Sequence, residues 1–200
     1  MPILDKEPAL YPNTLLSDGS DQPLGGTCVG LDNSYYPDPE KRVWWCVYTR
    51  SRQEKALARM LYAYEVPFYL PLVPQEHIYR KKRVKSYLPL FSGYMFMFGN
   101  DDERISALST NCISRMLPVD DPEQLVEDLL NIHRLIEFEA TMTVEQRLQP
   151  GRRVQVTNGS LAGTEGVVVD RRGERRLIVE VRMLNQGASV EIEDFMVEPY

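Results

Sequence analysis

Three glycines near the end of the chain have a spacing that could serve phosphate chemistry. Gly159, Gly163 and Gly166 lie in the stretch "GRRVQVTNGSLAGTEGVVV". A P-loop requires Gly-x-x-x-x-Gly-Lys-Ser/Thr followed by a helix, and a dinucleotide site also requires a helix after its glycines. Here Gly166 leads into "VVVD", a strand pattern with no lysine. The context therefore excludes both nucleotide sites and favours a turn between strands, in which Gly159 supplies a positive φ.

The other reactive residue types form no catalytic or metal-binding constellation. His77 and His133 are the only histidines, and neither has a nucleophile and a carboxylate at a useful spacing. Cys28, Cys46 and Cys112 are odd in number and widely spaced, which is typical of reduced thiols in a cytosolic protein. We therefore predict no catalytic residues, no metal and no cofactor.

One dense basic run could contact nucleic-acid phosphates. It lies near the predicted tip of a hairpin, from which it could reach DNA. Runs of charged residues are also often exposed to solvent without binding a ligand, and this alternative stays open. The run contains Arg80, Lys81, Lys82, Arg83 and Lys85.

Net charge argues against a broad nucleic-acid-binding surface. The chain carries −6 overall: residues 1–42 give 3 − 7 = −4, residues 43–147 give 13 − 14 = −1, and residues 148–200 give 7 − 8 = −1. Sequence-independent binding needs an extended basic face. Any nucleic-acid contact should therefore be local and assisted by a protein partner.

Composition indicates a cytoplasmic protein without a membrane segment. No run of about 18 apolar residues could span a bilayer. The first residues lack the basic start and apolar stretch of a signal peptide. We expect a monomer.

The chain divides into a tail, a mixed domain and an all-β domain. Residues 1–42 contain six prolines and no persistent apolar period, so we predict a disordered acidic tail. Residues 43–139 alternate strand and helix patterns, which indicates an α+β fold of the ferredoxin-like sandwich type. A linker at 140–148 follows. Residues 149–200 read as five short strands, which fit a small SH3-like β-barrel.

Two helices of the mixed domain have clear apolar faces. The first begins with a capping box made by Ser51 and Glu54. The last begins at Pro122, with Asp121 as its cap. A short helix after Asp101 should turn two apolar side chains inward. The inward positions are Leu57, Met60, Leu61 and Tyr64 in the first helix, Ile105 and Leu108 in the short helix, and Leu125, Leu129, Ile132 and Ile136 in the last.

The strand "YMFMF" should be apolar on both faces. Tyr94, Phe96 and Phe98 point one way, and Met95 and Met97 point the other way. Such a strand is covered on both sides. The second cover is either the domain's own core or a partner protein, and the pattern does not choose between them.

Several of these stretches together resemble one family. "GRRVQVTNGSLAGTEGVVV" resembles a KOW motif, and "WWCVYTRSRQEKALARML" followed by "PLFSGYMFMF" is similar to the N-terminal (NGN) domain of NusG. The order NGN domain (43–139), linker and KOW domain (149–200) is the architecture of the NusG family of transcription elongation and antitermination factors. The motif "PLF-x-x-Y-x-F" is similar to the sequences of the specialised RfaH-like branch of this family.

The resemblance implies partners for particular residues of the first domain. Phe91, Tyr94 and Phe96 correspond to an apolar patch that docks on the β′ clamp helices of RNA polymerase. The basic hairpin would reach upstream DNA at the transcription fork. RfaH-like proteins contact the β gate loop through a His-Thr-Thr run, whereas this chain reads "ERISALST". The residues that could substitute are Ser106, Ser109 and Thr110.

For the C-terminal domain, the resemblance implies a recruited partner. Met183 and Leu184 correspond to the segment with which NusG binds the ribosomal protein NusE or the termination factor Rho. Five glycines would each cost a helix about 1 kcal/mol, so we predict strands rather than the helical hairpin of some RfaH-like proteins. The alternative function is an RNA- or ribosome-binding KOW protein without polymerase contact.

Overall fold

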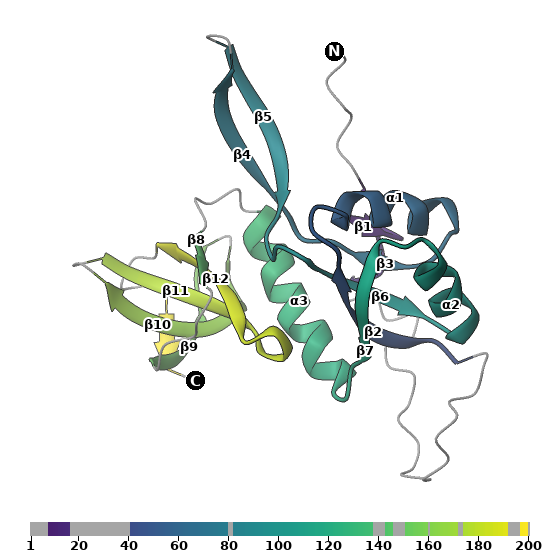
Figure 1. Ribbon diagram of the computed structural model, residues 1–200. Helices are drawn as coiled ribbons and strands as arrows, with labels where there is room; N and C mark the ends of the chain where they lie inside the picture. The colour runs from purple at the N-terminus through teal and green to yellow at the C-terminus, as the bar shows by residue number, and fades with distance from the viewer. Residues whose placement is uncertain are drawn as a thin grey trace. The chain divides into compact units, whose positions relative to one another are not determined.

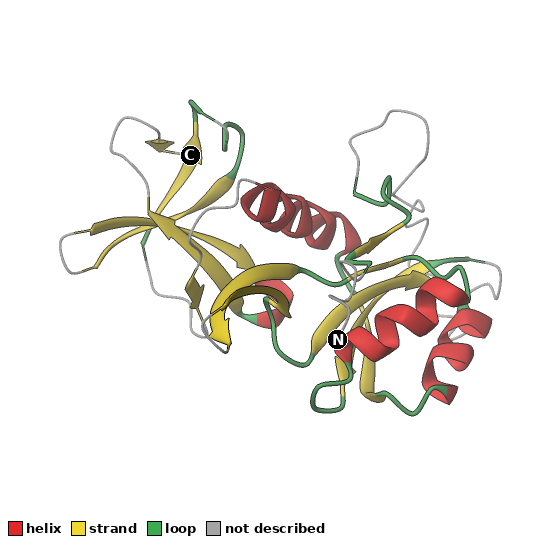
Figure 2. Ribbon diagram, turned by 90° about the horizontal axis from the view of Figure 1, so that it is seen from above, coloured by secondary structure: helices red, strands yellow, loops and turns green. Residues whose placement is uncertain are grey.

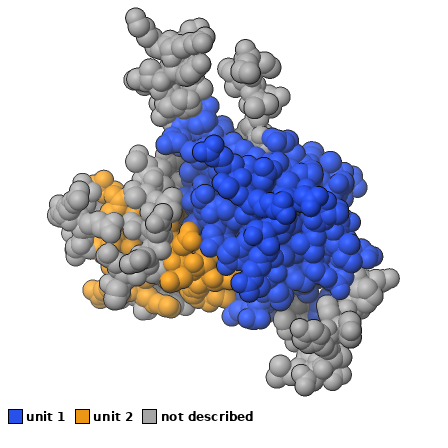
Figure 3. Space-filling view, viewed as in Figure 1, with its two compact units in different colours: residues 1–123 blue, residues 124–200 orange. Residues whose placement is uncertain are grey.

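The computed structural model describes residues 8–16, 41–79, 82–137, 143–145, 151–159, 161–171, 174–191 and 197–199. These residues belong to two compact units, residues 1–123 and residues 124–200 (Figure 3). Each unit is described by itself below.

The first unit is built on a five-stranded antiparallel sheet. Helices α1 (Glu54–Ala63) and α2 (Asp101–Ser109) lie against one face of this sheet (Figure 2). Valine, tryptophan and tyrosine dominate β2 (Val43–Thr49), one of the inner strands, as expected for residues that favour a pleated, buried surface. In order across the sheet, the strands are β1 (Leu10–Tyr11), β3 (Phe68–Tyr69), β6 (Tyr94–Gly99), β2 (Val43–Thr49) and β7 (Ile113–Pro118).

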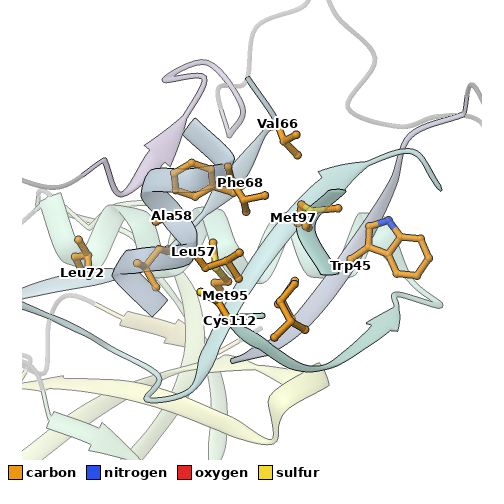
Figure 4. Close-up of a cluster of buried hydrophobic side chains, with 14 residues drawn as sticks. Trp45, Leu57, Ala58, Val66, Phe68, Leu72, Met95, Met97 and Cys112 are labelled. Carbon is orange, nitrogen blue, oxygen red and sulfur yellow. The ribbon is translucent and has the colours of Figure 1, made fainter. Parts of the chain in front are cut away.

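A hydrophobic core fills the space between this sheet and its two helices (Figure 4). Met95 and Met97 of β6 enter it beside Trp45 of β2, which confirms the predicted alternation of β6. Helix α1 contributes Leu57 with Ala58 and Leu61. Helix α2 contributes only a small residue, Ala107, which lets the helix lie close to the sheet.

Several predicted helix details are wrong. Ser51 does not cap α1, because the helix begins at Glu54 with Gln53 as its N-cap, and no side-chain cap bond forms there. Tyr64 follows the end of α1 and is 52% exposed. Ile105 and Leu108 of α2 point outward, with exposures of 58% and 40%. The capping box of the unit belongs instead to α2, where the Asn100 and Glu103 side chains each accept the other's backbone N–H.

Part of the predicted disordered tail is ordered. Residues 8–16 are described: Leu10 and Tyr11 form β1 on the edge of the sheet, and Leu15 and Leu16 are buried. The prediction failed here because nine uncharged residues are too few to show a period, although they pack against distant parts of the chain. The remainder of the tail, residues 1–7 and 17–40, lies outside the described residues.

Strands β4 (Leu72–Tyr79) and β5 (Lys82–Pro89) form a separate two-stranded ribbon that extends from the sheet (Figure 1). Pro74 lies within β4, opposite Tyr87 of β5. A ribbon of two strands has free edges on both sides, so a proline without an N–H is tolerated there.

The second unit joins a helix to an antiparallel sheet. Helix α3 (Pro122–Glu137) begins at the predicted proline, and its buried apolar residues are Leu125, Leu129, Ile132 and Leu135 rather than Ile136. The sheet has six described strands, one more than predicted, because part of the predicted linker forms a strand. In order across the sheet, the strands are β13 (Val197–Pro199), β9 (Arg152–Val156), β10 (Glu165–Arg171), β11 (Glu174–Val181), β12 (Gln186–Glu191) and β8 (Thr143–Glu145).

The fold class is therefore as predicted: an α+β domain followed by an antiparallel, KOW-like β region. The C-terminal strands also confirm that this region is not a helical hairpin in the structure. No helix among the described residues is long and apolar enough to cross a membrane.

Candidate functional site

The face of the five-stranded sheet that lies opposite the core is lined with aromatic rings. We call this surface the aromatic face. The Trp44 and Phe98 rings lie 5.3 Å apart, and the Tyr48 and Tyr94 rings lie 4.6 Å apart at an interplanar angle of 56°. Strand pairing sets these distances, because Trp44 is opposite Phe98 and Tyr48 is opposite Tyr94. The aromatic face consists of Trp44, Cys46 and Tyr48 of β2 and of Tyr94, Phe96 and Phe98 of β6.

Burial differs strongly between the three predicted docking residues. Phe96 is fully buried and Phe91 is 1% exposed, whereas Tyr94 is only partly buried. Of the three residues predicted to dock on the polymerase, Tyr94 is therefore the most accessible, and docking by all three stays a prediction. Tyr94 and its neighbour Tyr48 form one partly accessible end of the aromatic face, and the partly buried Phe98 lies at the other end.

A buried carboxylate holds the turn that precedes Tyr94. Glu54 is 6% exposed, and its Oε1 accepts a hydrogen bond of 2.7 Å from the backbone N–H of Gly93. Gly93 has φ +82°, a conformation that favours glycine. The backbone N–H of Tyr94 donates to the carbonyl of Phe91 at 3.1 Å. Sequence reasoning missed this role, because the pattern around Glu54 indicates only a helix cap.

Two ionisable side chains of the aromatic face, Tyr48 and Cys46, are kept neutral by their surroundings. Burial raises the pKa of the Tyr48 hydroxyl, and the neighbouring Tyr94 raises it further. Burial also raises the pKa of the Cys46 thiol to about 12. A thiol that stays protonated is a poor nucleophile. The surface is therefore suited to apolar contact and not to acid–base or thiolate chemistry.

The predicted gate-loop residues lie along α2. Ser106 and Ser109 are exposed, but the Ser109 hydroxyl donates to the carbonyl of Ser106 at 2.7 Å. The Thr110 hydroxyl likewise donates to the carbonyl of Ala107 at 2.6 Å. Ser106 and Ser109 line a groove of about 380 Å³ between α2 and the end of α1, with Tyr64, Val66, Asp102 and Glu103.

Only part of the predicted basic run can be placed. Arg80 and Lys81 lie outside the described residues. Lys82 and Arg83 are in β5, opposite Tyr79 and Ile78, at the end of the ribbon that is distant from the sheet. Lys85 is exposed, and its Nζ lies 5.8 Å from the centre of the Tyr87 ring.

The three glycines of the predicted KOW motif have different structural roles. Gly159 and Gly163 have φ of +84° and +83°, and both lie in the loop between β9 and β10. The Gly163 N–H donates to the carbonyl of Val156 at 2.7 Å, which closes the loop. At Gly166 the neighbouring backbone leaves no room for a side chain, because a Cβ there would lie 2.5 Å from the carbonyl oxygen of Ile178 in β11.

This difference predicts unequal outcomes for two substitutions. Gly166→Ala should lower the unfolding free energy by about 1–3 kcal/mol, because the backbone of β11 must move. Gly163→Asn should cost less, since asparagine tolerates a positive φ. Urea denaturation of both variants provides the measurement. Equal losses of stability would show that the close approach to Ile178 is not limiting.

The predicted partner-binding pair is split between surface and interior. Met183 is 37% exposed and Leu184 is 8% exposed, both in the short helix η1 (Arg182–Leu184) between β11 and β12. Asn185 ends this helix with φ 51°. Met183 can therefore contact a partner, whereas Leu184 anchors the turn.

A buried carboxylate links η1 to α3 within the second unit. The Asp128 side chain is 5% exposed, and its Oδ2 accepts a 2.8 Å hydrogen bond from the backbone N–H of Arg182. Its Oδ1 accepts one of 3.1 Å from the Gln124 amide and lies 3.8 Å from the Arg182 guanidinium. Burial raises the pKa of Asp128 to about 6, although these donors oppose the shift.

Comparisons with known proteins give a family match for part of the chain. Residues 42–134 match the NusG family model, described as "Transcription termination factor nusG". A solved structure entitled "Domain interaction in Thermotoga maritima NusG" is similar at 19% identity and a TM-score of 0.45, covering 81% of this chain and 99% of that chain. No curated protein matches.

The matched residues begin just before β2 and end within α3, so they include both helices of the first unit, the ribbon and the aromatic face. The description of this family model is that of a transcription factor. Residues 42–134, a little under half of the chain, are therefore a NusG-like domain.

Proposed function

We propose that the chain is a transcription elongation or antitermination factor that binds RNA polymerase through its first domain. The family match of residues 42–134 carries this proposal. On binding, the factor holds the polymerase in its forward state and suppresses pausing or termination in the cytoplasm. Its C-terminal β region recruits a second protein, for which the resemblance names NusE and Rho as candidates.

The Tyr48–Tyr94 end of the aromatic face is the proposed contact with the β′ clamp helices. Both rings are partly accessible, and burial raises the pKa of the Tyr48 hydroxyl, which suits packing against a helical partner. The Glu54 hydrogen bond to Gly93 fixes the turn from which Tyr94 projects. Phe91 and Phe96 are buried and stabilise β6 and the turn before it, so this proposal does not require them to contact the polymerase directly.

Tyr94→Ala is expected to reduce capture of core RNA polymerase about tenfold, because it removes an interfacial aromatic anchor. Capture of purified polymerase by the immobilised full chain provides the measurement, with circular dichroism to verify folding. Tyr94→Phe is the matched control, since it keeps the ring and should keep binding. Undiminished binding by a folded Tyr94→Ala variant would reject this surface.

The outer face of α2 is the proposed second contact, with the polymerase gate loop. Support comes from Ile105 and Leu108, which are exposed although apolar, and from the adjoining groove beside Ser106. The Ser109 and Thr110 hydroxyls already donate to backbone carbonyls. We therefore propose that Ile105 and Leu108 make the main contact with the gate loop through their apolar side chains.

The β4–β5 ribbon is the proposed contact with DNA at the transcription fork. Replacing Lys85 by glutamate should weaken cross-linking of the bound factor to DNA and lower the salt slope of binding by about one for each phosphate that the side chain no longer neutralises. The Lys85→Gln variant separates charge removal from charge reversal. Cross-linking that does not change would leave the basic run as a solvated end of the ribbon.

The exposed Met183 is the proposed contact of the C-terminal region with its recruited partner. It lies at the turn between β11 and β12, and the buried Leu184 fixes its position. Binding of RNA without any capture of polymerase would favour the alternative KOW function instead.

A further inference from the structure

We propose that residues 8–16 are a separable peptide ligand, carried on the same chain, that docks on the edge of β3 and against α1. We call this segment the N-terminal strap.

Main-chain pairing gives the strap the geometry of an added strand. Leu10 pairs with Tyr69 and Tyr11 pairs with Phe68, antiparallel to the edge of β3. The Leu70 N–H also donates to the carbonyl of Ala9 at 2.7 Å. Peptides that dock on a sheet edge bind in this way, with main-chain bonds for affinity and pockets for alternate side chains.

Side chains of the strap add contacts to this main-chain pairing. The Tyr11 ring meets the Tyr62 ring of α1 edge-on, with centroids 5.1 Å apart at 75°. Ala9 and Tyr11 pack against the core between α1 and the sheet. After a turn in which the Leu15 N–H donates to the carbonyl of Pro12, Leu15 and Leu16 are only 4% and 3% exposed.

The composition of the strap sets it apart from the chain on either side. Residues 1–42 contain ten charged side chains, and none of them lies in the strap sequence "PALYPNTLL". Asp5, Lys6 and Glu7 precede it, and Asp18 follows it. The segment is uncharged, contains one aromatic residue and three leucines, and has charged residues on both sides. This pattern is typical of a peptide that docks on a protein surface. The family match begins only at residue 42, so the strap is an addition to the matched domain.

The test uses the full chain with a specific protease site in place of residues 22–27. After cleavage, the N-terminal fragment should co-elute with the remainder in gel filtration. A labelled synthetic peptide of residues 7–17 should then replace the fragment, as measured by fluorescence anisotropy. The uncleaved chain should take up no peptide at the same concentration, because its own strap occupies the edge of β3.

A peptide with Tyr11→Ala and Leu15→Asp is the matched control and should bind about tenfold more weakly or less. Equal binding of the two peptides would overturn the proposal, as would release of the fragment without uptake of peptide by the folded remainder. Unfolding of the cleaved chain would also overturn it, since the strap would then be an inseparable part of the core.

A second measurement avoids cleavage. In the intact chain, Leu15→Asp together with Leu16→Asp should release the strap, so that chymotrypsin cuts the Leu10–Tyr11 bond at least about tenfold faster while the far-ultraviolet circular dichroism is retained. Unchanged protection of the Leu10–Tyr11 bond, or global unfolding of this variant, would contradict a separable ligand.

Discussion

Phe96→Ala is expected to lower the unfolding free energy of the first unit by about 3–5 kcal/mol. The ring is fully buried at the centre of the aromatic face, between Tyr69 of β3 and Cys46 of β2. Truncation removes its buried surface and leaves a cavity that strands on both sides prevent from closing. Urea denaturation followed by circular dichroism measures the change.

Phe98→Ala is the matched control for this prediction. It lies on the same strand and the same face, but it is only partly buried, so its truncation should be clearly less destabilising. Equal destabilisation would show that burial does not decide the effect. The comparison also matters for function, because reduced polymerase binding by a Phe96 variant would report impaired folding rather than a missing interaction with the polymerase.

The second large effect is a pH dependence of stability that arises from Asp128. Its pKa is raised from 3.8 to about 6 in the folded chain. The folded state therefore holds the proton more tightly than the unfolded state. This stabilisation is fully present below pH 3.8 and is lost as the pH rises to about 6. At about 1.4 kcal/mol per pKa unit, its upper limit is about 3 kcal/mol.

Asp128→Asn should remove this slope. Thermal unfolding between about pH 4 and pH 7 measures it, as the difference between the variant and the unchanged chain at each pH. Asparagine keeps an oxygen that can accept from the Arg182 N–H, so packing is preserved. Glu123→Gln is the control, because it neutralises an acid in the first turn of the same helix. Identical slopes for all three chains would contradict the prediction.

Local periodicity predicted the faces of the strands but not what covers them. The alternation of Tyr94, Phe96 and Phe98 with Met95 and Met97 indicated the two faces of β6 correctly, because a strand repeats every two residues. The same pattern fits a strand covered by its own chain or by a partner. Burial of Phe96 depends on distant segments, and no local pattern carries that information.

Short elements were the hardest to predict. In α2, Ile105 and Leu108 are the largest apolar residues and were expected to face inward, yet the small Ala107 does so. A helix of nine residues has too few positions for its period to decide between these faces. Strand β8 has three residues within the predicted linker and forms only by pairing with β12.

The resemblance to a family identified the first domain, but it did not indicate the roles of particular side chains. Gly163 and Gly166 belong to one motif, yet one adopts a positive φ and the other makes room for a neighbouring strand. Glu54 was visible in the sequence as a helix-start residue, while its hydrogen bond to Gly93 joins residues 39 positions apart. Such long-range pairs form only when the chain is folded.

The two-residue pairing of β1 with β3 also bears on the solubility of shortened forms of the protein. An uncovered strand edge is a template for pairing between molecules and so promotes aggregation. A chain that began at residue 42, where the family match begins, would lack β1 and leave the N–H and C=O groups on the outer edge of Phe68–Tyr69 without their present partners. Purification of the isolated domain is therefore better served by a chain that retains residue 8.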